Sequence, residues 1–372
     1  MNTIQEIYQR GQSVWCDHLS RELIASGELQ RLIDLGVAGV TSNPTIFMKA
    51  ITGSTGYDEA IHSALDAGVH DCDTLYERLA LADIADAADL FRPVYDRTRG
   101  VDGYVSLEVN PKLAYDATGT IAEGRRLFGE LDRPNIFIKV PATEPGLPAI
   151  ETLIADGINV NVTLIFSVAV YKQVMEAYLC GLHRLDKHGG DVSKVASVAS
   201  FFVSRVDTAV DKLIDSRRGR IPGIEKLRGK AAIANVDLAY SRFQEFFGEF
   251  SPFADLKERG ARVQRPLWAS TSTKNPSYPD TMYVDNLVAS DTVNTMPPET
   301  IEATLDHGSI GVRLGKRLAQ SREVLVQLAD AGIGLEEVTN QLTIEGVKSF
   351  AKSFEDLLEG LAQKLSTVRT NV

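Results

Sequence analysis

Short apolar runs alternate with longer amphipathic segments along this chain of 372 residues. Runs rich in aliphatic and β-branched residues predict eight strands, at 13–17, 39–44, 104–109, 135–143, 158–166, 195–203, 265–271 and 291–296. Apolar positions three and four residues apart predict helices, at 28–35, 75–95, 121–131, 143–156, 168–185, 205–217, 299–305, 313–331 and 335–365. Strands that alternate with helices are typical of a parallel sheet whose outer face is covered by helices.

Eight such repeats in one undivided chain predict a (β/α)8 TIM barrel. We expect a single domain over 1–372, with helical insertions near 45–73 and 221–260 and a C-terminal helical extension over 313–372. A doubly wound open sheet is the alternative, but such a sheet usually carries a G-x-G-x-x-G or P-loop nucleotide motif. Neither motif occurs in the sequence.

Polar residues fall on one face of the predicted strands. In the fifth strand Asn159, Asn161 and Thr163 alternate with aliphatic residues. Because the outer helices require apolar partners, the aliphatic residues should point outward and the polar residues into the barrel. The same alternation points Glu108 of the third strand and Lys139 of the fourth strand inward. Three further polar residues can take matching positions on other strands: Asp17, Asn43 and Ser270.

Lys139 is the residue that suggests a chemistry. A strand-end lysine often extends its amine to water, and taken alone this explanation is preferred. The inward polar residues lie toward the carboxyl ends of their strands, however, where barrel enzymes assemble their active sites. A buried amine without a partner tends to be neutral, and a neutral lysine adds to a ketone to form a Schiff base that supports C–C cleavage. Glu108 and Asp17 are then the candidate acid and base, and Thr163 could position a water.

Each of these residues also has a purely structural explanation. A single inward asparagine or threonine is more often a core polar group with its hydrogen bonds satisfied, and a single glutamate at a strand end usually faces solvent. Their shared direction is what favours a polar pocket around Lys139.

Charge and composition exclude several other classes of protein. A net charge of −11 argues against a nucleic-acid partner, because phosphate polymers require a basic face, whereas a small anion needs only a local pair of cations. The six histidines are dispersed, so no metal centre is expected. His18 is set aside because adjacent residues in a strand point in opposite directions. Scattered cysteines, with no signal peptide or membrane span, indicate a cytoplasmic protein.

Two stretches resemble the signature segments of the transaldolase family. Residues 39–47, Gly-Val-Thr-Ser-Asn-Pro-Thr-Ile-Phe, resemble the first, and residues 138–143 together with 157–167 resemble the second. The resemblance implies that Lys139 forms the Schiff base, that Glu108 and Thr163 hold the catalytic water, and that Asp17 is the base. It also implies that the dihydroxyacetone unit is bound by Asn43, Asn161 and Ser200.

Phosphate binding in this family uses arginines after the sixth and seventh strands. Arg205 matches the first of these positions. Many relatives carry an arginine after the seventh strand, but this chain has Ser270 followed by a segment that ends at Lys274, so Lys274 is expected to replace it. A lysine supplies charge without the planar fork of a guanidinium. The insertions and the C-terminal helices are similar to those of the longer bacterial members.

The resemblance implies a cofactor-independent reaction of the pentose phosphate pathway. A dihydroxyacetone unit would move from sedoheptulose 7-phosphate to glyceraldehyde 3-phosphate, giving erythrose 4-phosphate and fructose 6-phosphate. A fructose 6-phosphate aldolase of the same superfamily is the nearest alternative, although such aldolases resemble shorter chains. A non-catalytic barrel that binds sugar phosphates is the other. The sequence leaves open whether the protein is a monomer or a homodimer.

Overall fold

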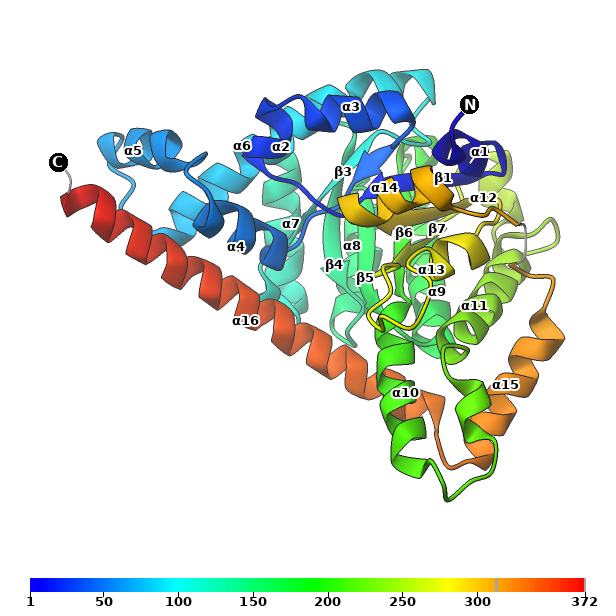
Figure 1. The fold of residues 1–372 in the computed structure, drawn as a ribbon. Coiled ribbons are helices and arrows are strands. Elements are labelled where there is room, and N and C mark those ends of the chain that lie inside the picture. The colour runs from blue at the N-terminus through cyan, green and yellow to red at the C-terminus, as the bar shows by residue number, and fades with distance from the viewer. Residues whose placement is uncertain (312–313, 371–372) are drawn as a thin grey trace.

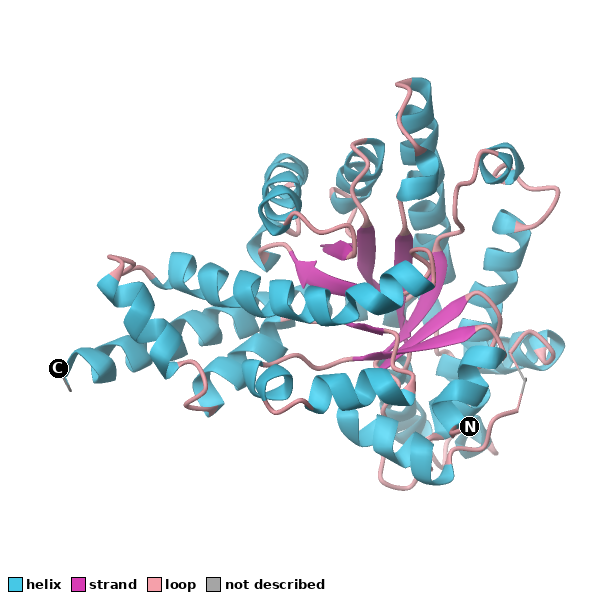
Figure 2. Ribbon diagram, turned by 90° about the horizontal axis from the view of Figure 1, so that it is seen from above, coloured by secondary structure: helices cyan, strands magenta, loops and turns pink. Residues whose placement is uncertain are grey.

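The computed structural model describes residues 1–311 and 314–370, without the side chains of 367–370. In these residues eight parallel strands close into a barrel in chain order, and β8 pairs with β1. Figure 2 shows the strands at the centre with helices around them. The predicted TIM barrel is therefore confirmed. The strands are β1 (Gln12–Cys16), β2 (Gly39–Val40), β3 (Tyr104–Glu108), β4 (Ile136–Pro141), β5 (Val160–Ile165), β6 (Ser197–Phe202), β7 (Arg265–Ala269) and β8 (Thr292–Met296).

Most of the predicted helices are present, with small differences at their ends. The helices that follow the barrel strands are α3 (Glu28–Leu35), α6 (Cys72–Arg97), α7 (Ala117–Leu131), α8 (Gly146–Ala155), α9 (Val168–Lys187), α10 (Ser204–Arg217) and α14 (Pro298–His307). Arg313, at the start of one predicted helix, lies outside the described residues, and the corresponding helix α15 runs from Leu318 to Asp330. Shorter helices are α1 (Thr3–Gln9), α2 (Arg21–Ala25), α12 (Ala254–Glu258) and α13 (Met282–Asn286), with η1 (Pro111–Leu113), η2 (Val192–Lys194) and η3 (Ile224–Leu227).

The segment after β2, where a helical insertion near 45–73 was predicted, contains two helices. Pro44 opens helix α4 (Pro44–Gly53), and α5 (Asp58–Asp66) follows. Proline is favoured in the first turn of a helix, where its missing N–H has no intrahelical partner. Asn43 caps this helix, because its Oδ1 accepts a hydrogen bond of 3.1 Å from the N–H of Ile46. The strand predicted over 39–44 is shorter than expected, since β2 ends at Val40, and Pro44 starts a helix instead of ending the strand. The later insertion contains α11 (Ala231–Phe247).

Aromatic rings fill the amino-terminal half of the barrel. The ring centroids of Tyr104 and Phe137 lie 4.3 Å apart, and Trp15 lies 6.4 Å from the first ring and 6.0 Å from the second. Below them the buried Asp102 accepts hydrogen bonds from the Trp15 indole, at 3.3 Å, and from Arg265, at 3.0 Å. The barrel is thus closed at this end by aromatic rings and by a buried ion pair between Asp102 and Arg265.

The long helix α16 (Leu335–Thr370) packs against α4, α6 and α10. Figure 1 shows it running from beside α10, past α4, to the far side of α5. Close to the barrel it approaches β5, where a Cβ placed on Gly346 would lie 2.9 Å from Cδ2 of Leu164. The C-terminal segment therefore forms part of the wall around the carboxyl end of the barrel.

Candidate active site

A cavity of about 500 Å³ opens at the carboxyl ends of the strands. Its lining includes eight of the ten residues proposed from the sequence: Asp17, Asn43, Lys139, Thr163, Ser200, Arg205, Ser270 and Lys274. The other two adjoin it, since Glu108 lies beside Lys139 and Asn161 bonds to Ser200. The barrel thus brings together residues that are spread over most of the chain.

Lys139 lies near the end of β4, with only 5% of its surface exposed. Its Nζ donates a hydrogen bond of 3.1 Å to the carbonyl oxygen of Ser42 and lies 3.7 Å from Oε2 of Glu108. Ser42 is itself held in place, because its hydroxyl donates to the carbonyl of Ser106 at 2.6 Å. The amine is therefore held between the segment after β2 and the end of β3, and it faces the cavity from within the barrel.

Glu108, at the end of β3, has an altered acidity. Burial raises the pKa of its carboxyl group from 4.5 to about 7, while attraction to Lys139 lowers this pKa and repulsion by Asp17 raises it further. The rise in the pKa of Glu108 caused by burial is larger than the decrease caused by the Lys139 amine. Near neutral pH the carboxyl group therefore exists in both protonation states, as suits a general acid and base.

Two buried oxygens near Lys139 make no hydrogen bond to other described residues, and they are Oε2 of Glu108 and Oγ1 of Thr163. Buried polar atoms usually have partners, so each can hold a reacting group or a water. Thr163 stands immediately before an irregular point in β5. The pairing with β6 shifts between Val162 and Ile165, and Leu164 has a φ of 60°. Strict alternation of side chains, from which the inward residues were predicted, holds only up to this bulge.

Asp17 is oriented by two threonines that no sequence pattern singled out. Thr41 Oγ1 donates to Asp17 Oδ1 at 2.9 Å and lies 2.9 Å from Oγ1 of Thr295. Because β1 ends at Cys16, Asp17 and the next residue, His18, lie beyond the strand. Both line the cavity, so the expectation that they point in opposite directions was wrong. Burial lowers the pKa of the His18 imidazole, which favours its neutral form.

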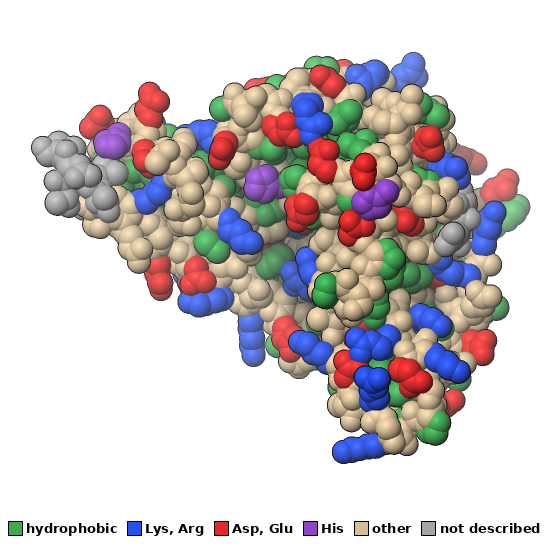
Figure 3. Space-filling view, viewed as in Figure 1, with side chains coloured by type: hydrophobic (Ala, Val, Ile, Leu, Met, Phe, Trp, Pro, Cys, Tyr) green, Lys and Arg blue, Asp and Glu red, His purple; other side chains and the backbone are tan. Residues whose placement is uncertain are grey.

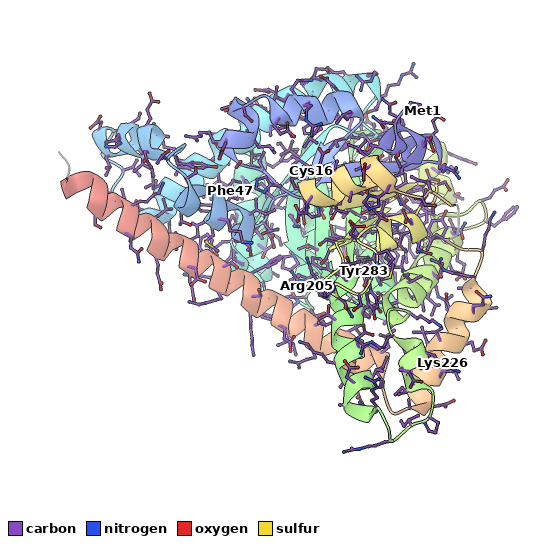
Figure 4. All side chains as sticks on the ribbon, viewed as in Figure 1. Met1, Cys16, Phe47, Arg205, Lys226 and Tyr283 are labelled. Atoms are coloured by element: carbon purple, nitrogen blue, oxygen red, sulfur yellow. The ribbon has the colours of Figure 1, made fainter. Side chains whose placement is uncertain are left out.

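A second group of side chains supplies positive charge to the cavity. Arg205, in the first turn of α10, lies with its guanidinium carbon 5.0 Å from the ring of Phe202. Figure 4 labels Arg205 where α10 leaves the barrel, beside α16. Burial lowers the pKa of this guanidinium, and the carboxylates of Asp17 and Glu108 oppose that change. Arg205 is thus a largely desolvated cation that faces two acidic groups.

The loop after β7 is fixed next to α10. Ser270 has a φ of 58°, its Oγ lies 2.9 Å from Oγ of Ser204, and its carbonyl accepts from the Ser204 N–H at 3.0 Å. Lys274, which is more exposed, donates to Ser272 Oγ at 2.7 Å. The start of α10 and the loop after β7 therefore both present hydrogen-bond donors to the cavity, from Arg205, Ser270 and Lys274. Such a group of donors suits an anion. Lining residues that no sequence pattern distinguished include Lys49 of α4 and Phe350 of α16.

Other kinds of site have less support. In residues 1–311 and 314–370 no three histidine, cysteine or acidic side chains gather as metal ligands. No helix in the described part of the chain is long and apolar enough to cross a membrane. Figure 3 shows acidic and basic side chains interspersed over the face in view, without a continuous basic stripe.

Comparison with known proteins gives a consistent result. A family model described as transaldolase/fructose-6-phosphate aldolase matches residues 14–361. A protein named transaldolase from Saccharopolyspora erythraea is 48% identical over 370 residues, which cover 99% of each chain. A transaldolase from Mycolicibacterium smegmatis is 48% identical over 96% of each chain, and transaldolase 2 from a Nostoc species is 44% identical over 98%.

Proposed function

The chain belongs to the transaldolase/fructose-6-phosphate aldolase family and catalyses the transaldolase reaction, and we propose that Lys139 carries the transferred dihydroxyacetone unit as a Schiff base. The observation that carries this proposal is the buried Lys139 amine, 3.7 Å from a glutamate whose pKa is about 7. An amine and an acid at this separation supply the nucleophile and the proton that imine formation requires.

The reaction begins when Nζ of Lys139 attacks C2 of sedoheptulose 7-phosphate. The N–C bond forms, the amine proton passes to the carbonyl oxygen, and a carbinolamine results. Glu108 then donates a proton to the C2 hydroxyl, and water leaves to give the iminium. Thr163, whose hydroxyl has no other partner among the described residues, holds this water against Glu108.

Cleavage follows when Asp17 removes the proton from the C4 hydroxyl. The C3–C4 bond breaks, its electron pair passes to the iminium nitrogen, and erythrose 4-phosphate departs. The remaining enamine attacks the aldehyde carbon of glyceraldehyde 3-phosphate, and Asp17 returns its proton to the new hydroxyl. Water activated by Glu108 then adds to C2 and releases fructose 6-phosphate from Lys139. Thr41 positions Asp17 for both proton transfers through its 2.9 Å hydrogen bond.

Substrate binding divides between the two ends of the cavity. Ser200 donates to Asn161 Oδ1 at 2.7 Å, and Asn161 donates to Ser106 Oγ at 3.0 Å, which fixes both side chains next to Lys139. Together with Asn43 they bind the hydroxyls of the dihydroxyacetone unit. The phosphate binds at the other end, where Arg205, Ser270 and Lys274 line the cavity.

Borohydride trapping tests this proposal. The enzyme is incubated with fructose 6-phosphate, reduced with borohydride and digested, and the modified peptide is identified by mass spectrometry. We expect one three-carbon adduct on Lys139 and none in Lys139→Arg. The exposed Lys49, which lines the same cavity, is the internal control. An adduct on Lys49, or no adduct, contradicts the assignment.

Three finer points are also proposals. The fructose 6-phosphate aldolase reaction is the alternative within the family, and it would release free dihydroxyacetone from fructose 6-phosphate without an acceptor. We expect this release to be slow compared with transfer to erythrose 4-phosphate. A cytoplasmic location and a monomeric or homodimeric state remain predictions from the sequence. Size-exclusion chromatography with light scattering would test the oligomeric state.

A further inference from the structure

Phe350 is the one residue of the described part of α16 that lines the active-site cavity. Its ring centroid lies 6.0 Å from Nζ of Lys139 and 6.0 Å from Cζ of Arg205. Only 4% of the Phe350 surface is exposed. A single apolar ring therefore lies next to both the reacting amine and the cation of the proposed phosphate site.

The position of this ring is fixed by the rest of the helix. Leu357 and Leu361 of α16 are fully buried, and Ser353 accepts a hydrogen bond of 2.8 Å from the Thr45 hydroxyl of α4. On the other side Gly346 lies against Leu164, where a Cβ would come within 2.9 Å. The backbone of Phe350 is thus held between two anchored stretches of the helix.

The transfer reaction requires that the enamine on Lys139 be protected from water. After cleavage, the enamine on Lys139 must wait for an aldehyde. If water instead gives a proton to C3, the resulting iminium takes up the hydroxide at C2, and dihydroxyacetone leaves Lys139. That sequence consumes one water and restores the amine, so an enzyme that allows it acts as an aldolase. Apolar groups around a reactive intermediate suppress such side reactions by excluding water.

Resting on the proposed Schiff-base function, we propose that Phe350 determines reaction specificity by shielding the enamine on Lys139 from water. The ring occupies space beside the amine that would otherwise admit solvent from the open side of the cavity. Its contact with Arg205 places the same ring against the phosphate-binding wall, so the shield extends along the bound sugar. The C-terminal helix thereby supplies the residue that favours transfer over release.

Phe354 offers a matched control, because it lies one turn further along α16 and is equally buried, with 3% of its surface exposed. Its ring packs 5.4 Å from that of Tyr76 and lines a different cavity, which Glu108 also lines but Lys139 does not. Replacing either phenylalanine with alanine removes similar apolar contacts from the same helix. Only the Phe350 replacement removes a side chain next to Lys139.

The test measures two products of one enzyme. With fructose 6-phosphate as donor and erythrose 4-phosphate as acceptor, free dihydroxyacetone and sedoheptulose 7-phosphate are quantified together. Their ratio does not depend on how much of a variant is folded. We expect Phe350→Ala to raise the ratio of release to transfer by about tenfold or more, a change equivalent to about 1.4 kcal/mol. Phe350→Leu should restore most of the wild-type ratio, and Phe354→Ala should leave it unchanged.

An unchanged ratio in Phe350→Ala, or an equal rise in Phe354→Ala, overturns the inference. If the alanine variant yields too little folded enzyme, Phe350→Val provides the same comparison with a smaller change in volume. Borohydride trapping on the same samples separates this inference from the proposed function. A wild-type enzyme that forms no adduct on Lys139 contradicts both, whereas an adduct with an unchanged ratio contradicts only the role of Phe350.

Discussion

Replacing Glu108 with glutamine should change how the stability of the protein depends on pH. The pKa of Glu108 rises from 4.5 to about 7 in the fold, chiefly because the carboxyl group is buried. The native state therefore binds this proton more tightly than the unfolded chain. Its contribution to stability is complete below about pH 4.5 and is lost as the pH rises to about 7.

The size of the effect follows from the two pKa values. Each pH unit between them is equivalent to about 1.4 kcal/mol, so ionisation of Glu108 destabilises the fold by about 3 kcal/mol once the pH exceeds 7. Glutamine has a similar shape and does not ionise. We therefore expect the free energy of unfolding of Glu108→Gln, relative to the wild type, to increase by about 2 to 3 kcal/mol between about pH 5 and pH 8.

Urea unfolding followed by circular dichroism at several pH values measures this difference. The experiment distinguishes burial from the ion pair, because attraction between Glu108 and Lys139, 3.7 Å apart, acts in the opposite direction. A difference that stays constant with pH, or one in which the wild type gains stability as the pH rises, refutes the reasoning. Activity provides a second measurement, since loss of a general acid lowers kcat by about 10²- to 10⁴-fold.

Three other substitutions test the phosphate site, the orientation of the base and the closed end of the barrel. Arg205→Ala should lower kcat/KM for fructose 6-phosphate by about 10- to 100-fold, because hydrogen bonds to charged groups contribute about 1.5 to 3 kcal/mol, but it should spare unphosphorylated fructose. Thr41→Val removes the hydrogen bond to Asp17 and should lower kcat about tenfold at constant KM. Arg265→Met leaves Asp102 buried without its cation and should lower the free energy of unfolding by about 3 to 5 kcal/mol.

Each of these expectations has a result that contradicts it. Equal losses with both sugars would exclude a phosphate-specific role for Arg205. A raised KM with normal kcat would mean that Thr41 contributes to binding rather than to the orientation of Asp17. For Arg265, a normal thermal unfolding midpoint would show that the buried ion pair is replaceable, and a reduced kcat in the fully folded variant would show that the closed end influences the chemistry.

The sequence predicted the barrel and most of its site because both depend on local patterns. Alternation within a strand is a property of neighbouring residues, so the inward direction of Lys139 and Glu108 follows from the order of residues alone. Asp17 and His18 were treated as strand residues, although β1 ends at Cys16, and the alternation rule therefore failed there. Strand ends depend on tertiary hydrogen bonds, which a single sequence does not specify.

Contacts between distant segments could not be predicted in this way. Phe350 belongs to an ordinary amphipathic helical pattern, and nothing in that pattern distinguishes a residue facing the active site from one facing the core. The register shift around Leu164, whose side chain packs against Gly346 of α16, likewise leaves no signal in the strand pattern. Asn43 was expected at the end of the second strand, but β2 ends at Val40, and Asn43 caps the helix that Pro44 begins.

The position of α16 also has a consequence for the order in which the protein is made. Synthesis proceeds from the amino terminus, so all eight strands emerge from the ribosome before this last helix. Lys139, Glu108 and Asp17 all precede Phe350 in the sequence, so the strands that position them are made before Phe350 is added. A nascent chain, or one shortened by proteolysis before α16, thus contains Lys139 but lacks the Phe350 ring beside it. The cavity therefore gains its Phe350 wall only when the last helix has been made.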